Sequence, residues 1–233
     1  MLNNNNNIII FKNILYCKMD QKIISVIGGS GFIGNYLIDK LLESGYYVKI
    51  ISRKSVAKKN FYPSAKLGQY SMINCNICDE KKLDSIIEGS FCVINLVGVL
   101  EDKKKNSFNA AHVQGSESIM KSCKKHNIQK LIHISAIGVD KNKRSNYAIT
   151  KFKSEKNIRK VQNSIIIRPS IVFGYEDNFL NFFANYAKFS PFLPLIGGGR
   201  TKFQPILVSD LVQIIIGCIN KQFKQGQIIE AGG

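Results

Sequence analysis

The sequence predicts an α/β fold in which a doubly wound parallel sheet carries helices on both faces. Three observations support this. Five or six short β-branched runs alternate with stretches of helical periodicity, an order typical of parallel sheets. The first run leads directly into a glycine-rich turn and a helix. The length of 233 residues is enough for one such domain with a small additional lobe.

The turn from Gly28 to Gly34 is the most informative segment. Ile23–Ile27, just before it, is an apolar run that indicates a buried strand, and apolar residues recur at helical spacing after it. Gly28, Gly31 and Gly34 therefore lie between a strand and a helix, where backbone N–H groups and the helix N-terminus favour a pyrophosphate. We expect a dinucleotide site of the Rossmann type; a purely structural tight turn is the alternative.

The other elements of this region follow in order. Gly45 is expected to end the first helix. Further strands are expected at residues 47–52, 72–75, 91–96, 130–135 and 164–168. Helices are expected at residues 79–88 and 108–126. The ligand is expected at the crossover between the first and fourth strands, because open parallel sheets bind ligands where the strand order reverses.

We divide the chain into three segments. Residues 1–21 form a disordered or mis-assigned extension, residues 22–174 the dinucleotide-binding Rossmann domain, and residues 175–233 a partial second lobe interleaved with the last Rossmann elements. In the third segment we expect a helix, a loop, a short strand, a second helix capped by Ser209 and Asp210, and a last strand. Their residues are 179–186, 190–199, 203–208, 209–219 and 228–230.

Composition limits the classes of function. The net charge of +17 comes from lysines spread along the chain, a pattern typical of an A/T-biased genome, and there is no basic stripe with interleaved aromatics of the RNA-binding kind. We expect no nucleic-acid partner and no transmembrane segment; weak attraction to acidic lipids or an acidic subunit stays open. Six scattered cysteines without a secretory signal indicate a reducing compartment. Cys75 and Cys78 are expected to be structural thiols, with a redox pair as the alternative.

The end of the second strand bears on the choice of cofactor. NAD-specific domains carry an acid there to hold the ribose 2′-hydroxyl, whereas this chain has Arg53 and Lys54. A guanidinium suits a 2′-phosphate, so we favour NADP(H) over NAD(H); two surface charges on a solvated loop are the alternative. The loop after the third strand should run past the adenine, and Gly98 should lie near the centre of the cofactor.

Ser135, Tyr147 and Lys151 are the candidate catalytic residues. Tyr147 and Lys151 are four apart on an expected helix and so share one face. An ammonium stabilises a nearby phenolate, which allows general acid/base catalysis, and the serine hydroxyl would polarise a substrate carbonyl. The alternative is a cofactor clamp without turnover. The three histidines show no metal spacing, and no metal site is expected.

Several motifs carry a resemblance to a known family. They are Asn95–Gly98, His112–Gly115, His133–Gly138, Arg168–Gly174, Pro191–Gly199 and Phe203–Ile206. With the glycine turn, they resemble atypical extended short-chain dehydrogenase/reductases. The last two are more specific and look like the NADPH-binding accessory subunit of respiratory complex I and its bacterial relatives.

The resemblance implies a tightly held NADPH with a structural role. As alternatives it implies an active reductase, epimerase or dehydratase on a quinone-like or nucleotide-sugar substrate, or a non-catalytic interaction module. The implied partners are complex I or membrane-associated quinone enzymes. The implied location is the mitochondrial matrix in a eukaryote, or the cytoplasm or the periphery of the inner membrane in a bacterium.

The resemblance also assigns binding residues. It implies contacts to the diphosphate, the 2′-phosphate, the adenine, the central ribose, the nicotinamide ribose and the nicotinamide. In that order, the residues are Gly28, Gly31, Phe32 and Ile33; Arg53; Asn76 and Ile77; Val97 and Gly98; Tyr147 and Lys151; and Pro169. Two departures stand out: Asn76 replaces an acid found in many relatives, and family members continue beyond Gly233, so an incomplete C-terminal lobe is expected.

Overall fold

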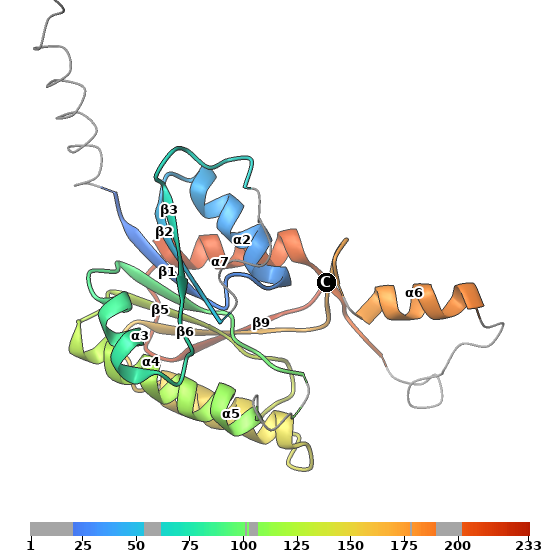
Figure 1. Cartoon of the computed structure of the whole chain (residues 1–233). Coiled ribbons are helices and arrows are strands. Elements are labelled where there is room, and N and C mark those ends of the chain that lie inside the picture. Colours follow the sequence, from blue (N-terminus) through green and yellow to red (C-terminus); the bar gives the residue numbers. More distant parts are fainter. Residues whose placement is uncertain (1–20, 54–61, 101, 103–106, 178, 190–201) are drawn as a thin grey trace, which may run out of the picture.

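A parallel sheet forms the centre of the molecule. The computed structural model describes residues 21–53, 62–100, 102, 107–177, 179–189 and 202–233. Within these residues seven parallel strands lie in the order β3-β2-β1-β4-β5-β6-β9 (Figure 1). Their bounds are β1 Ile23–Ile27, β2 Tyr47–Ser52, β3 Tyr70–Asn74, β4 Cys92–Asn95, β5 Lys130–Ile134, β6 Ser164–Pro169 and β9 Gln227–Ala231. The predicted α/β fold with a parallel sheet is confirmed.

The strand order reverses at β1. This strand pairs with β2 on one side and with β4 on the other, so the chain is wound outward in both directions from it. Such a reversal leaves a crevice at the carboxyl ends of the central strands, where the loops after them diverge. The predicted crossover between the first and fourth strands is confirmed, and the candidate site lies there.

Helices cover both faces of the sheet. Their bounds are α2 Phe32–Glu43, α3 Glu80–Ile87, the π-helix η1 Asn109–Gln114, α4 Gly115–Lys125, α5 Asn146–Ile158, α6 Phe179–Phe189 and α7 Val208–Asn220. Helices α2 and α7 share one apolar core with the sheet, and α3, α4 and α5 share the other. Because β4 and β6 are buried along their whole length, their sequences are nearly continuous apolar runs, as central parallel strands require.

The turns and caps agree with the sequence in most places. Gly45 ends α2 with a φ of +87°, and the side chain of Asp79 accepts a hydrogen bond from the Lys82 amide at the start of α3. One expectation was wrong: α7 starts at Val208, and its N-cap Leu207 makes no side-chain cap. Ser209 and Asp210 lie in its first turn, because Leu207 ends β8 and the strand runs directly into the helix.

The C-terminal part returns to the main sheet. Strand β9 pairs with β6, while β7 (Val172–Phe173) and β8 (Ile206–Leu207) form a separate two-stranded ladder. Helix α6 projects away from the sheet (Figure 1). The expected extension at 1–21, apart from Gln21, and the expected loop at 190–199 lie outside the described residues. No helix among the described residues is long and apolar enough to cross a membrane.

Candidate functional site

The glycine turn brings backbone close to backbone. Gly28 has a φ of +83°, and a Cβ built on it would lie 3.2 Å from the amide nitrogen of Val97. A Cβ on Gly34 would lie 2.2 Å from the carbonyl oxygen of Gly29. Helix α2 starts after Gly31 without a side-chain cap and without an acid in its first turn. Its first N–H groups, which have no partner within the helix, are therefore available to an anion.

A first cavity of about 250 Å³ opens beside this turn. It lies between the ends of β1, β2 and β4, the loop after β3, and the start of η1. Of the residues expected to bind the cofactor, it is lined by Gly28, Gly31, Arg53, Asn76, Ile77, Val97 and Gly98. Lys54 lies outside the described residues. No carboxylate is found among the described lining residues, so Arg53 is the charged group of this cavity.

A second cavity of about 650 Å³ continues from the first. The two share Gly28, Gly31 and Gly98, so they form one groove across the carboxyl ends of the central strands. Of the remaining expected residues, the second cavity is lined by Phe32, Ile33, Ser135, Tyr147, Lys151 and Pro169. All the sequence-derived candidates except Lys54 therefore line one groove.

The ammonium of Lys151 is buried at the middle of this groove. Its Nζ donates hydrogen bonds to the carbonyl oxygens of Ile134 at 2.8 Å and Val97 at 3.2 Å. Burial lowers the pKa of Lys151 to about 8, although Glu155 opposes the shift. An ammonium has three donors, so these two hydrogen bonds leave one for a ligand.

Tyr147 lies one helical turn before Lys151. Its ring makes edge contacts with Phe108 and His112, with ring centres 5.8 and 5.5 Å apart. Burial raises the pKa of Tyr147, the direction opposite to that expected where an ammonium stabilises the phenolate. In this state the phenol is protonated at neutral pH and can donate a proton or a hydrogen bond.

His112 is a neighbour that the sequence patterns did not single out as functional. Its Nε2 accepts a hydrogen bond from the Val99 amide, and its Nδ1 lies 3.0 Å from Oγ1 of Thr150. Burial and the charge of Lys151 lower the pKa of His112 to about 3, so the ring is neutral. It joins the loop after β4 to helix α5, and only the fold brings these two together.

Two serine hydroxyls in the groove have no hydrogen-bond partner among the described residues. Ser135 directly follows β5 at the second cavity, and Ser52 ends β2 at the first; both are buried. A buried hydroxyl without a partner is costly, and a bound polar ligand would supply what these two lack. Ser52 was missed in the sequence, where only its neighbour Arg53 carries a recognisable signal.

The cysteines of the first cavity are free thiols. Cys75 and Cys78 both line it, and Sγ of Cys78 donates to the carbonyl oxygen of Ala110. Burial raises the pKa of both thiols, and Arg53 opposes this at Cys78. They are therefore poor nucleophiles at neutral pH. No group of three or more potential metal ligands occurs in the part of the chain that the structure describes.

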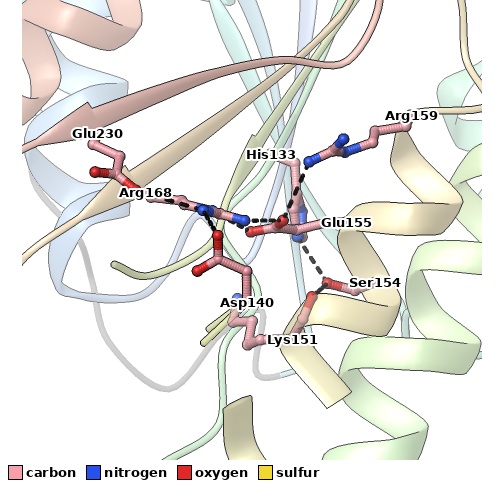
Figure 2. Close-up of polar contacts among 8 residues, drawn as sticks. All are labelled: His133, Asp140, Lys151, Ser154, Glu155, Arg159, Arg168 and Glu230. Atoms are coloured by element: carbon pink, nitrogen blue, oxygen red, sulfur yellow. Dashed lines mark hydrogen bonds and ion pairs between the residues drawn. The ribbon is translucent and has the colours of Figure 1, made fainter. Parts of the chain in front are cut away.

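Helix α5, which carries Tyr147 and Lys151, is anchored by a buried ion pair. Figure 2 shows the guanidinium of Arg168, on β6, beside the carboxylate of Glu155. The two make two hydrogen bonds of 2.9 and 2.8 Å, and Arg168 also contacts Asp140 and Glu230. The pair fixes the position of α5 along β6, and therefore also the position of the side chains of α5 that face the groove.

Comparisons with known proteins agree with this geometry. A model of the NAD dependent epimerase/dehydratase family matches residues 24–232. The chain is 30% identical over 215 residues to the mitochondrial NADH dehydrogenase (ubiquinone) 1 alpha subcomplex subunit 9 of Arabidopsis thaliana, covering 91% of this chain and 54% of that protein. The mouse protein of the same name is 32% identical over 197 residues, covering 83% and 52%. The chain thus spans about half the length of these curated relatives.

Solved structures support the fold. A dTDP-glucose 4,6-dehydratase from Streptomyces venezuelae, solved with NAD bound, superposes with a TM-score of 0.73 and 19% identity, covering 91% of this chain and 76% of that one. A UDP-galactose 4-epimerase gives a TM-score of 0.71 at 17% identity, covering 91% and 77%. At these identities the likeness establishes the architecture, a Rossmann-type sheet, and no more.

Proposed function

The chain belongs to the NAD dependent epimerase/dehydratase family, and on that premise we propose that it binds NADP(H) as a structural group in a subunit of the complex I accessory type. The observation that carries this proposal is the groove. Its glycine turn and the uncapped start of α2 suit a diphosphate, and Arg53 lies in a cavity with no carboxylate among its described lining residues.

The names of the relatives support the proposed partner. The Arabidopsis and mouse proteins are named as mitochondrial NADH dehydrogenase subunits. We therefore place this chain beside complex I, in the mitochondrial matrix of a eukaryotic cell or at the cytoplasmic side of the inner membrane in a bacterium. The bound nucleotide would then hold the central strands and α5 together, because a ligand that binds only the folded state stabilises it.

The first prediction concerns the nucleotide. NADPH at one hundred times its dissociation constant should raise the melting temperature by about 5–10 °C. NADH should raise it less, because it lacks the phosphate that Arg53 would pair with. Arg53→Asp should abolish or reverse this preference. Thermal melts with each nucleotide, together with mass spectrometry of any nucleotide that copurifies, measure both effects.

The control for this experiment is Lys153→Asp, an exposed change on α5 that alters the net charge equally. It should leave the NADPH preference intact. Equal shifts with NADPH and NADH in the wild type would refute the role of Arg53. Absence of any nucleotide affinity would refute the proposal and favour the third candidate, a non-catalytic interaction module.

One observation favours an active enzyme as the second candidate function. Ser135, Tyr147 and Lys151 line the same cavity, and the Ser135 hydroxyl has no partner among the described residues. In that case a bound nicotinamide would supply or accept a hydride. Tyr147 would donate its proton to the substrate oxygen when hydride is delivered and take that proton back in the reverse direction, while Lys151 would hold the ribose. The substrate class would be quinone-like or a nucleotide sugar.

The second prediction separates the two functions. Under the structural proposal the protein binds NADPH without turnover of quinone or nucleotide-sugar substrates, and Tyr147→Phe changes affinity by less than about tenfold. If the protein is an enzyme, Tyr147→Phe should remove turnover while NADPH binding persists. A steady-state assay of nicotinamide absorbance measures turnover, and a Tyr46→Phe variant, at a tyrosine between α2 and β2 that lines neither cavity, is the matched control.

A further inference from the structure

A line of buried polar groups joins the end of β4 to helix α5. It starts at Asn95, the last residue of β4, whose Oδ1 accepts a hydrogen bond from the Val97 amide at 3.0 Å. The side-chain amide nitrogen of Asn95, Nδ2, lies 3.0 Å from Nδ1 of His133, on the neighbouring strand β5. Because an amide nitrogen can only donate, Nδ1 of His133 must be the acceptor and carry no proton.

The proton of His133 therefore lies on Nε2. This nitrogen is 3.0 Å from Oγ of Ser154, and that hydroxyl donates its one hydrogen to the carbonyl oxygen of Lys151 at 2.7 Å. Figure 2 shows His133, Ser154 and Lys151 in line on the sheet-facing side of α5. All three are buried, and every donor in the line has one acceptor, so its direction and the tautomer of His133 are fixed.

Lys151 closes the line into a ring. While its carbonyl oxygen accepts from Ser154, its Nζ donates back to the carbonyl oxygen of Val97. The Val97 residue is thus held at both ends, its N–H by Asn95 and its C=O by Lys151. Lys151 also lies beside Gly98, where an added Cβ would be 3.6 Å from Nζ.

We propose that His133 is a positioning residue, which through this ring fixes Lys151 against Val97 and Gly98 at the middle of the nucleotide groove. The inference rests on the proposed function. Its consequence is local: Lys151 lines the second cavity and Val97 lines the first next to Gly98, which both cavities share, whereas Arg53 and Asn76 line only the first. Disturbing the ring should therefore weaken contacts to the nicotinamide half of NADPH and spare those to the adenine half.

The test uses two ligands and two ring variants of the full chain. Ser154→Ala removes the acceptor of the His133 proton with little change of shape, and His133→Gln replaces the imidazole itself. Each should raise the dissociation constant of NADPH about fivefold or more, since a hydrogen bond contributes roughly 1 kcal/mol. The dissociation constant of adenosine 2′,5′-bisphosphate, which carries only the adenine half, should change less than about twofold, within a few tenths of a kcal/mol.

The control is Ser25→Ala. It breaks a buried hydrogen bond of 2.8 Å between Ser25, on β1, and Ser90, before β4, away from the ring, and should affect neither ligand. Nitrogen NMR of the imidazole gives an independent measure: wild-type His133 should be the Nε2–H tautomer, because Asn95 donates to Nδ1, and Ser154→Ala should keep that tautomer while it shifts the Nε2 resonance.

Three outcomes would overturn the proposal. If a ring variant weakens both ligands equally, or neither, His133 has only a general structural role. If the wild-type His133 carries its proton on Nδ1, the ring as described is wrong. If the wild type binds neither ligand, the proposed function fails, and the positioning role fails with it.

Discussion

At the scale of single residues, the site depends on glycines, which have no side chain, as much as on the residues whose side chains line it. The carbonyl oxygen of Gly29 lies where a Cβ of residue 34 would be, and Gly28 holds a left-handed conformation against the backbone of Val97. These contacts let α2 start directly after β1, which places its N-terminus over the end of the sheet. Glycine is therefore required at these two positions for packing before any ligand is considered.

The third prediction tests this requirement. Gly34→Ala would place Cβ 2.2 Å from a backbone oxygen, which no side-chain rotation relieves. We expect a loss of about 2 kcal/mol or more in the free energy of unfolding. Gly217→Ala, in α7, meets nothing within 4 Å and should stabilise by about 0.5–1 kcal/mol. Urea denaturation measures both; equal values for the two variants would contradict the steric argument.

The residue scale also shows what the sequence could reveal about the site. Gly28, Arg53 and Lys151 were predictable because each belongs to a motif whose position between strand and helix has a physical reason. Ser52 and His112 were not, because a buried serine or histidine has no spacing of its own. What sets them apart is that the Ser52 hydroxyl has no hydrogen-bond partner among the described residues and that His112 contacts Tyr147, 35 residues away; both features exist only in the fold.

At the scale of elements, α5 connects the chemistry of the groove to the sheet. Its groove-facing residues Tyr147 and Lys151 are followed one turn later by Glu155, which is fully buried against Arg168 of β6. The ion pair has two parallel hydrogen bonds. Asp140 also helps to raise the pKa of Arg168, and Glu230 lies 3.5 Å from the guanidinium and partly balances its charge. This pair therefore fixes the position of α5 on the sheet together with the contacts of Lys151 and Ser154 to β5.

The fourth prediction follows from this pair. Glu155→Gln leaves a buried guanidinium with only partly exposed acids to balance it, so we expect a loss of about 3–5 kcal/mol in the free energy of unfolding. Lys40→Met breaks the exposed Lys40–Glu43 pair of α2 and should cost less than about 1 kcal/mol. Chemical denaturation of both variants measures the difference. A Glu155→Gln variant as stable as Lys40→Met would show that the anchor is not needed.

Element boundaries were predictable where local chemistry sets them, and unpredictable where packing does. Asp79 and Gly45 mark the start of α3 and the end of α2 as expected. The helix expected over residues 108–126 instead begins with the π-helical turn η1, whose Ala110 and Ala111 line the first cavity. No periodicity in the sequence indicates that wider turn. It is set by contacts with α5 and with the loop after β4, which exist only in the folded chain.

At the scale of the whole molecule, the buried polar groups are held in one protonation state. His112 and His133 are neutral, and both lie near the buried ammonium of Lys151, which helps to lower their pKa values. The chain also carries a large positive charge, 33 basic against 16 acidic residues. Further protons therefore add charge to an already basic molecule and, at these two sites, add it inside the core.

The fifth prediction is acid sensitivity, and its sign follows from the direction of these shifts. The unfolded chain protonates His112 near pH 6.5, whereas the folded chain resists protonation until about pH 3, so unfolding takes up a proton between these values. Stability is complete above pH 6.5 and falls as the pH drops through this window. With a pKa near 6.5 in the unfolded chain and about 3 in the folded chain, His112 alone should account for about 2 kcal/mol between neutral pH and pH 5. His112→Gln should flatten the dependence of the unfolding free energy on pH, measured by urea titration at each pH, and His133 should supply the slope that persists.

A wild-type stability that stays constant from pH 7 to pH 5 would mean that neither imidazole is held neutral. The fixed tautomer on which the ring at Lys151 depends would then be lost as well.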